Sequence, residues 1–321
     1  MLTFTDIERA RRNLKPYIFP TPLLRCAWLE ERVGAPVFCK LENLQRTGAF
    51  KIRGAMNRLM QLDFNTRAKG VVTASAGNHG LGVAQAAKLF DCPATVFVPV
   101  DASPLKVSKL RQMGVTLRQE GRDYDEAEAL AQAYADAKSL SFIHGFAQPE
   151  VIAGQGTIGL ELLEQMPTPE VPICVVIPVG GGGLLAGIAI AVKSKSPQSK
   201  IVGVQSEASP AMARALAAGK VVETPIEETI ADGLAGRLVA ENMLKLTQQF
   251  CDEMLLVRES SIRLAMREFY FRHGWRVEGS AAVGAAAILE NKVQAMGMPI
   301  VLIVSGGNVA EEIFNRSIAF L

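Results

Sequence analysis

Residues 174–192 read CVVIPVGGGGLLAGIAIAV, which is an apolar run, a block of four glycines and a second apolar run. The first run, Cys174–Val179, is short and β-branched, as in a strand buried on both faces, and the second run resembles a buried helix. Strand, glycine turn and helix in this order are the building unit of a parallel sheet covered by helices. Four consecutive glycines would break a membrane-spanning helix, so the stretch is predicted to belong to a soluble α/β domain.

The same alternation of strand and helix patterns continues through most of the chain. Short β-branched runs predict strands, and the segments between them predict helices. The fold class is therefore α/β, and 321 residues favour two such domains over one. The other predicted strands are Val37–Leu41, Gly70–Thr73, Ala94–Pro99, Val115–Arg118, Ser141–His144, Lys200–Gln205, Met254–Val257 and Pro299–Val304, and the predicted helices include Gly80–Phe90, Ser103–Met113, Tyr124–Ala137, Ile152–Glu164, Ser260–His273 and Ala281–Glu290.

The composition excludes several classes of protein. Hydrophobic residues make up 49% of the chain, which is enough for a large core and excludes disorder. Lys and Arg number 34 against 32 Asp and Glu, so no strong field attracts nucleic acid or an anionic membrane. The 5 cysteines are scattered and odd in number, which fits reduced thiols. No apolar leader follows the N-terminus, so we expect a cytoplasmic protein.

The glycine block Gly180–Gly183 carries the first chemical signal. Glycines let backbone N–H groups turn inward on an anion at the positive end of the following helix. Four of them cost chain entropy that a simple turn would not require, which favours an anion site. Gly181, Gly183 and Ala186 also match a dinucleotide-binding pattern, but the next strand ends in Gln205 and not in an acid. A simple phosphate group therefore fits better than a dinucleotide.

Three further motifs contain polar groups where strands end or helices begin. Lys51 lies between Phe50 and Ile52. Most such lysines are solvated, but one held among apolar groups has its charged form disfavoured and can form a Schiff base. The segment 75–79 (SAGNH) joins a strand to a helix, where it can hold a carboxylate or cap the helix. Residues 305–308 (SGGN) repeat the strand, Ser and Gly pattern near the C-terminus.

Taken together and in this order, these motifs resemble the fold-type-II pyridoxal-phosphate enzymes, above all the threonine/serine dehydratase (ammonia-lyase) and serine racemase family. The resemblance implies two domains, each with a mostly parallel sheet flanked by helices: residues 1–52 and 151–321 in a large cofactor-binding domain, and 53–150 in a small mobile one. It extends over essentially the whole chain, from Thr21-Pro22-Leu23 through Gln155-Gly156-Thr157, Ala231-Asp232-Gly233 and Glu278-Gly279-Ser280 to Ser305-Gly306-Gly307-Asn308.

The resemblance also implies pyridoxal 5′-phosphate as the cofactor and a role for individual residues. Lys51 matches the Schiff-base lysine, which also serves as the base at Cα of the substrate. Phe50 matches the aromatic residue beside the cofactor ring, Asn78 the partner of its phenolic oxygen, and Ser305 the partner of its pyridine nitrogen. The loop that binds the phosphate corresponds to Gly180, Gly181, Gly182, Gly183 and Leu184, the loop that binds the substrate carboxylate to Ser75, Ala76, Gly77, Asn78 and His79, and two residues near the ring to Gly233 and Glu278.

A hydroxyl at the pyridine nitrogen cannot keep that nitrogen protonated as an aspartate would, so the ring is a weaker electron sink and β-elimination is favoured. The expected reaction is the dehydration and deamination of L-threonine and/or L-serine to a 2-oxo acid and ammonia, by a homodimer or homotetramer. The alternatives are a dehydratase of another 3-hydroxy amino acid such as 3-hydroxyaspartate, a serine racemase-like enzyme, a β-replacement enzyme of the cysteine synthase type, and a nicotinamide-dependent dehydrogenase or nucleotide-binding module.

Several departures from the family pattern narrow this expectation. Ala49 stands where dehydratases usually carry serine. Ala76 stands where racemases carry the serine that acts as the second acid/base, so efficient racemisation is not expected. Gln205 and Ala211 stand where racemases carry metal-ligating acids, so no metal is predicted there. The sequence ends at residue 321, so a C-terminal regulatory domain like that of the biosynthetic threonine dehydratases is not expected either.

Overall fold

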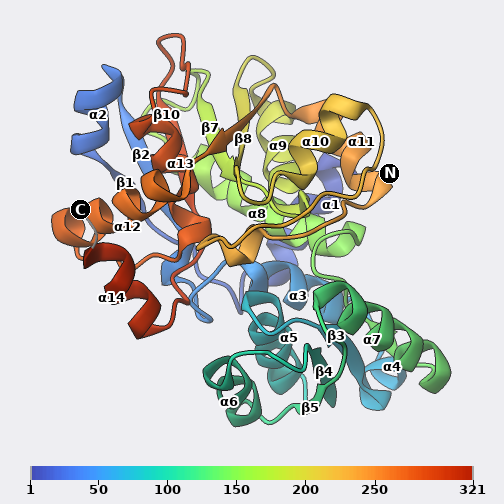
Figure 1. Cartoon of the computed structure of the whole chain (residues 1–321). Coiled ribbons are helices and arrows are strands. Elements are labelled where there is room, and N and C mark those ends of the chain that lie inside the picture. Colours follow the sequence, from blue (N-terminus) through green and yellow to red (C-terminus); the bar gives the residue numbers. More distant parts are fainter. Residues whose placement is uncertain (1, 320–321) are drawn as a thin grey trace.

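The structure is a computed structural model that describes residues 2–319, and it contains two sheets (Figure 1). The larger has six strands in the order β1-β2-β10-β7-β8-β9, and the smaller has four in the order β5-β4-β3-β6. The β1–β2 pair is antiparallel and the other neighbouring pairs are parallel. The strands are β1 Leu23–Arg25, β2 Val37–Leu41, β3 Val71–Ala74, β4 Ala94–Val98, β5 Thr116–Gln119, β6 Ser141–Phe142, β7 Cys174–Pro178, β8 Lys200–Ser206, β9 Glu253–Val257 and β10 Ile300–Val304.

Both faces of the six-stranded sheet are buried under helices, which confirms the predicted α/β class. Alternate residues of one strand enter two different cores: Val176 belongs to the core under α2, α12 and α13, and Val175 to the core under α8, α9 and α11. Burial on both sides explains why the strands read as continuous apolar runs without alternation. The helices are α1 Phe4–Leu14, α2 Ala27–Val33, α3 Lys51–Met60, α4 Phe64–Lys69, α5 Asn78–Leu89, α6 Pro104–Gln112, α7 Tyr124–Lys138, α8 Pro149–Gln165, α9 Gly183–Lys195, α10 Ala211–Ala218, α11 Glu241–Phe250, α12 Glu259–His273, α13 Gly279–Leu289 and α14 Glu311–Ala319, with short 3₁₀ helices η1 Glu42–Leu44 and η2 Asp232–Leu234.

Each predicted strand overlaps an observed strand, and each predicted helix overlaps an observed helix. Strand β1 is the strand that the sequence pattern missed, because it has three residues and lies at an edge of the sheet. Leu24 and Arg25 are exposed, so β1 lacks the apolar run that marks the buried strands. The helices named from the sequence also leave out α1, α2, α4, α10, α11 and α14. Among residues 2–319, no helix is both long and apolar enough to cross a membrane.

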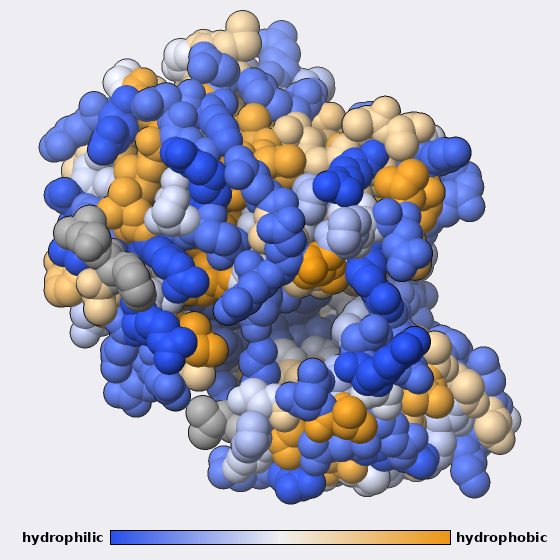
Figure 2. Space-filling view, in the orientation of Figure 1, coloured by the Kyte–Doolittle hydropathy of each residue, from blue (hydrophilic) through white to orange (hydrophobic). Residues whose placement is uncertain are grey.

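We call the six-stranded sheet with its helices the large region and the four-stranded sheet with its helices the small region. The chain passes from the large region to the small one through α3 and returns through α8. These two helices touch through their backbones: a Cβ on Gly54 would lie 2.7 Å from the Val151 carbonyl oxygen, and one on Gly154 would lie 2.5 Å from the Arg53 carbonyl oxygen. The surface between the two regions is hollowed (Figure 2).

Candidate active site

Lys51 is the first residue of α3 and lies where the two regions meet. Its Nζ donates a hydrogen bond to the Gly145 carbonyl oxygen at 2.9 Å and lies 5.3 Å from the centre of the Phe50 ring. Burial lowers the Lys51 pKa to about 8, although the negative charges of Glu278 and Glu128 oppose this. A neutral fraction of the amine is therefore present near pH 7, so Lys51 differs from an ordinary solvated lysine and can act as a nucleophile or a base.

The glycine block forms the turn between β7 and α9, as predicted. Gly182 precedes α9 with φ +89°, a conformation that favours glycine, and it has no side chain to cap the helix. A Cβ on Gly181 would lie 2.5 Å from the Phe146 ring, and one on Gly183 would lie 2.6 Å from the Phe146 carbonyl oxygen. Close packing and backbone conformation therefore both require glycine here. The first N–H groups of α9, which include that of Leu184, stay available for an anion such as phosphate, and Gly180 begins the turn that leads to them.

Ser305 directly follows β10 and is buried. Its carbonyl oxygen accepts a hydrogen bond from the Phe50 backbone N–H at 3.1 Å, and the next residue, Gly306, forms an isolated β-bridge with Ala49. The end of β10 is thereby attached to the start of α3. Ser305 and Lys51 are distant in sequence, and these backbone contacts bring them to the same site.

Asn78, Glu278 and Asn308 form a hydrogen-bonded group between the two regions. The Asn78 Nδ2 donates to the two carboxylate oxygens of Glu278 at 2.8 and 3.1 Å, and the Asn308 Nδ2 donates to Asn78 Oδ1 at 2.8 Å. Burial raises the Glu278 pKa to about 7, although the hydrogen bond from Asn78 opposes this. Asn308 was not among the predicted site residues. The SGGN motif contains it, but its contact with Asn78 depends on the tertiary fold.

The predicted carboxylate-binding loop lies at the start of α5. The residue that precedes the helix is Gly77, and the Ser75 Oγ instead accepts from the Gly77 N–H at 3.1 Å. The expectation that Ser75 or Asn78 caps α5 is therefore wrong, because the Asn78 side chain turns to Glu278. Among the described residues, none approaches within 4 Å of a Cβ built on Gly77, so there is space in front of this loop. Ala76 is half-buried beside it.

His79 contributes to this loop through its backbone and not through its ring. The side chain is buried, and Nε2 hydrogen-bonds to the Ile143 carbonyl oxygen at 3.0 Å. Burial, helped by the positive charge of Lys51, lowers the His79 pKa to about 3. The ring is therefore neutral near pH 7 and donates its Nε2–H to the carbonyl. In this geometry His79 is a structural residue and is not placed to act as a general base.

Gly233 lies in η2, between the glycine block and α13. A Cβ on Gly233 would lie 2.8 Å from the Ser280 Oγ, and a Cβ on Gly180 would lie 3.1 Å from the neighbouring Leu234 Cα. Within residues 2–319 the buried Ser280 Oγ has no hydrogen-bond partner. An unsatisfied buried hydroxyl near the glycine turn fits a site built for a polar ligand.

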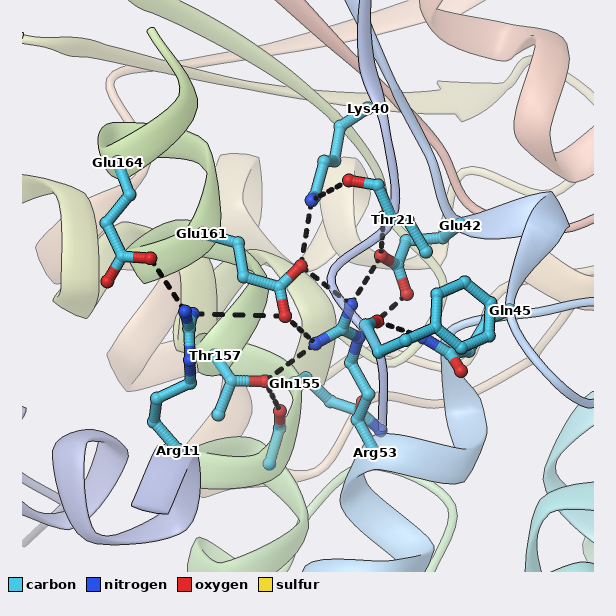
Figure 3. Close-up of polar contacts among 12 residues, drawn as sticks. Arg11, Thr21, Lys40, Glu42, Gln45, Arg53, Gln155, Thr157, Glu161 and Glu164 are labelled. Carbon is cyan, nitrogen blue, oxygen red and sulfur yellow. Dashed lines mark hydrogen bonds and ion pairs between the residues drawn. The ribbon is translucent and has the colours of Figure 1, made fainter. Parts of the chain in front are cut away.

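A buried ion cluster, defined here as Lys40, Glu42, Arg53 and Glu161, connects the end of β2 with α3 and α8 (Figure 3). Arg53 of α3 donates to Glu42 at 2.8 Å and to Glu161 of α8 at 2.6 Å, and Lys40 of β2 donates to Glu161 at 2.8 Å. Burial alone would raise the Glu161 pKa, but Arg53 and Lys40 hold it below its ordinary value. The sequence analysis did not identify this cluster.

Three basic side chains make contacts, called here the mouth contacts, that cross the cleft between the regions. These side chains are Lys106 and Lys109 of α6 in the small region, and Arg237, which follows η2. The contacts are Lys106 with Asp232 at 2.7 Å, Lys109 with Asn308 at 2.8 Å, and Arg237 with Asp125 at 2.8 Å and with Asp123 at 3.0 Å.

The position predicted to lack a metal has an amide in place of an acid. The Gln205 Oε1 accepts a hydrogen bond from the Ala213 backbone N–H at 2.9 Å, in the first turn of α10. In the part of the chain that the structure describes, no group of three or more His, Cys, Asp or Glu side chains is arranged to hold a metal ion.

Comparison with known proteins finds relatives that are named for the same reaction. The L-threonine ammonia-lyase of Thermotoga maritima is 41% identical over 318 residues, which cover 99% of this chain and 78% of that protein. The catabolic L-threonine dehydratase of Staphylococcus aureus is 37% identical over 313 residues, covering 96% and 90%.

Solved structures match over similar lengths. The processed form of threonine deaminase isoform 2 from Solanum lycopersicum has a TM-score of 0.90 and 33% identity, covering 98% of this chain and 86% of that one. Maize serine racemase has a TM-score of 0.91 and 34% identity, covering 99% and 97%. A family model described as pyridoxal-phosphate dependent enzyme matches residues 14–306. The resemblance seen in the sequence is thereby confirmed, and the chain belongs to the family of pyridoxal-phosphate-dependent enzymes.

Proposed function

We propose that this protein is a lyase that converts L-threonine and/or L-serine to a 2-oxo acid and ammonia with pyridoxal 5′-phosphate. The observation that carries the proposal is the position of Lys51, a half-buried amine with a lowered pKa. Its hydrogen-bond partner Gly145 adjoins Phe146, which packs on the glycine turn, and a Cβ on Gly145 would lie 3.8 Å from the His79 ring at the uncapped start of α5. The names of the relatives, which include L-threonine ammonia-lyases, support the same reaction.

The residues present fit the cofactor. The N–H groups at Gly180–Gly183 and Leu184 suit its phosphate, the Asn78 amide its phenolic oxygen, the Ser305 hydroxyl its pyridine nitrogen and the Phe50 ring its flank. Gly233 and Glu278 complete the surroundings of the ring. The bound cofactor supplies an electron sink that stabilises negative charge on Cα of an amino acid.

Lys51 is the proposed base for the α-proton. Its pKa of about 8 means that the amine can take up a proton near neutral pH and release it again without a large energetic penalty. The Gly145 carbonyl oxygen accepts from the same nitrogen and orients it. The His79 ring, with its pKa lowered to about 3, is too weak a base to take up this proton near pH 7.

The substrate carboxylate is proposed to bind at Ser75, Ala76, Gly77, Asn78 and His79. The free N–H groups at the start of α5 and its positive dipole end favour a negative group there. Ala76 has no group that can exchange a proton, so this position supplies no second acid/base on the opposite face of Cα. That favours elimination over the serine racemase alternative.

The test is to measure keto-acid release by the purified holoenzyme with L-threonine, L-serine and L-threo-3-hydroxyaspartate, and D-serine formation from L-serine. We expect turnover with L-threonine or L-serine. In Lys51→Ala we expect no turnover and no cofactor fixed to the chain by borohydride, whereas Lys138→Ala, at an exposed helix end, retains both. Turnover in Lys51→Ala, or keto acid from 3-hydroxyaspartate alone, would contradict the proposal.

We also propose that residues 1–52 and 151–321 form one domain and residues 53–150 a second, mobile one that closes on the substrate. The two separate sheets support this division. A cytoplasmic homodimer or homotetramer is proposed as well. The five cysteines, all free thiols, agree with a reducing compartment, and light scattering of the purified protein measures the oligomeric state.

A further inference from the structure

The side-chain amide of Asn308 is held between two groups whose hydrogen-bonding sense cannot change. The Thr47 carbonyl oxygen can only accept, and it receives Asn308 Nδ2 at 2.6 Å. The Lys109 ammonium can only donate, and its Nζ lies 2.8 Å from Asn308 Oδ1. The two partners together fix which end of the amide is oxygen and which is nitrogen.

The orientation of Asn308 fixes that of Asn78. The second N–H of Asn308 Nδ2 donates to Asn78 Oδ1 at 2.8 Å, so the Asn78 oxygen is already engaged. The Asn78 Nδ2 must then face the opposite way, where it donates to the buried Glu278 carboxylate. Hydrogen-bond donation therefore runs in one direction from the exposed Lys109, through two amides, into the site.

We propose that Lys109 is a positioning residue that acts through Asn308 to keep the N–H groups of Asn78 turned into the cofactor site. This inference rests on the proposed role of Asn78 at the phenolic oxygen of the cofactor, which needs a donor. A reversed Asn78 amide would direct its lone pairs at Glu278 and at that oxygen, and both contacts would be repulsive.

The chain of hydrogen bonds also connects the two regions. Lys109 lies on α6 of the small region, whereas Asn308, Thr47 and Glu278 belong to the large region. The orientation of Asn78 is complete only when α6 is against the large region. The cofactor surroundings consequently differ between the closed and the open arrangement of the cleft.

Lys106 provides a matched control on the same helix. It carries the same charge and crosses the same cleft, but its partner is Asp232, outside the amide chain. Its positive charge acts on Glu278, where it opposes the raised pKa. If the lysines of α6 worked only through charge, Lys106→Met would therefore change the site at least as much as Lys109→Met.

The experiment compares holoenzyme variants in the absence of substrate. The readouts are the ratio of the long-wavelength to the ultraviolet absorption band of the bound cofactor, and the cofactor dissociation constant. For Lys109→Met we expect an altered ratio and an affinity about twofold to tenfold weaker, which is the effect of one hydrogen bond. Lys109→Arg keeps a donor and restores both values, and Lys106→Met keeps both at the wild-type values.

Asn308→Asp sharpens the test, because it retains an acceptor for Lys109 but loses both donors. We expect a larger spectral change than in Lys109→Met. An unaltered spectrum and affinity in Lys109→Met, the same changes in Lys106→Met, or a wild-type spectrum in Asn308→Asp would each overturn the inference. Lys109 is exposed, so Lys109→Met is compatible with folding. Failure of the proposed reaction is separately visible as absent turnover, since these readouts need no substrate.

Discussion

The two regions are joined by charged contacts of two opposite kinds. In the buried ion cluster, the Arg53 and Glu42 side chains are 1% and 0% exposed, whereas in the mouth contacts Lys106 and Asp232 are 41% and 60% exposed. Separating a buried pair leaves a charge without compensation in a low dielectric, but an exposed pair exchanges its partner for water at little cost. The molecule is therefore stiff where the chain crosses between the regions and compliant where a substrate enters.

The contrast is reinforced by the backbone. At Gly54 and Gly154 the backbones of α3 and α8 approach so closely that a Cβ on either glycine would lie within 3 Å of a carbonyl oxygen of the other helix, so these crossings are closely packed as well as ion-paired. The mouth contacts are made by long, flexible basic side chains. When the proposed small domain closes, we expect it to rotate about the crossing of α3 and α8 and to rearrange the mouth contacts.

The largest expected effect tests the stiff side. Arg53→Met leaves Glu42 and Glu161 buried without their shared cation, and we expect the free energy of unfolding to fall by about 3–5 kcal/mol. Urea unfolding measures it. Arg237→Met, which removes an arginine from the mouth, is the control. Equal losses of unfolding free energy in Arg53→Met and Arg237→Met would contradict the distinction between the buried ion cluster and the mouth contacts.

The next effect concerns the close packing between Phe146 and the glycine turn. A methyl group on Gly181 would lie 2.5 Å from the Phe146 ring, so Gly181→Ala is expected to cost about 1–3 kcal/mol of stability and to weaken cofactor binding. Gly236→Ala is the control, because a Cβ there would meet its nearest neighbour, the Leu238 carbonyl oxygen, at 3.8 Å. Unchanged cofactor affinity in Gly181→Ala would show that the ring moves aside freely.

Glu278 tests whether a buried acid that forms no ion pair within residues 2–319 behaves differently from Glu161, which is paired with Arg53 and Lys40. Its folded pKa of about 7 lies above the ordinary 4.5, so the folded state holds the proton more tightly. The resulting stability is present below pH 4.5 and is lost as the pH rises through 7, by about 3 kcal/mol at most.

Glu278→Gln cannot ionise and therefore lacks this loss. Urea unfolding of both proteins between pH 4.5 and 8 should show the wild type losing stability relative to the variant. Parallel pH profiles would mean that Glu278 is paired or solvated in solution.

The smallest effect is expected at the mouth. Arg237→Gln breaks exposed pairs with Asp123 and Asp125, so we expect a loss of about 0.2–1 kcal/mol, which diminishes further as salt is added. Denaturant titrations at low and high salt measure it. A loss of unfolding free energy comparable to that of Arg53→Met would mean that the mouth contacts stabilise the protein as much as the buried ion cluster does, and would contradict the contrast drawn above.

Most of the framework could be predicted from local sequence signals. Continuous apolar runs identified the buried strands, and the glycine block identified the turn before α9. What escaped prediction depends on partners that are distant along the chain. In the sequence, Arg53 and Glu161 look like ordinary surface charges of two helices, and their pairing becomes visible only when the helices pack together. The role of the Asn308 amide likewise depends on its contacts with Lys109 and Asn78, which the fold brings together. Strand β1 was missed because it is short and exposed.

The path of the chain has a consequence for how such a protein diversifies. The small region is inserted between β2 and β7 of the large sheet, and its entry and exit helices are in contact. An inserted segment whose two ends lie side by side can be exchanged as a unit, here called the cassette, without disturbing the strand order of the sheet that it interrupts, here called the host. The loop proposed to hold the substrate carboxylate belongs to this cassette, whereas the glycine turn belongs to the host. Recombination can therefore vary substrate recognition while the glycine turn, proposed to hold the cofactor phosphate, is inherited intact.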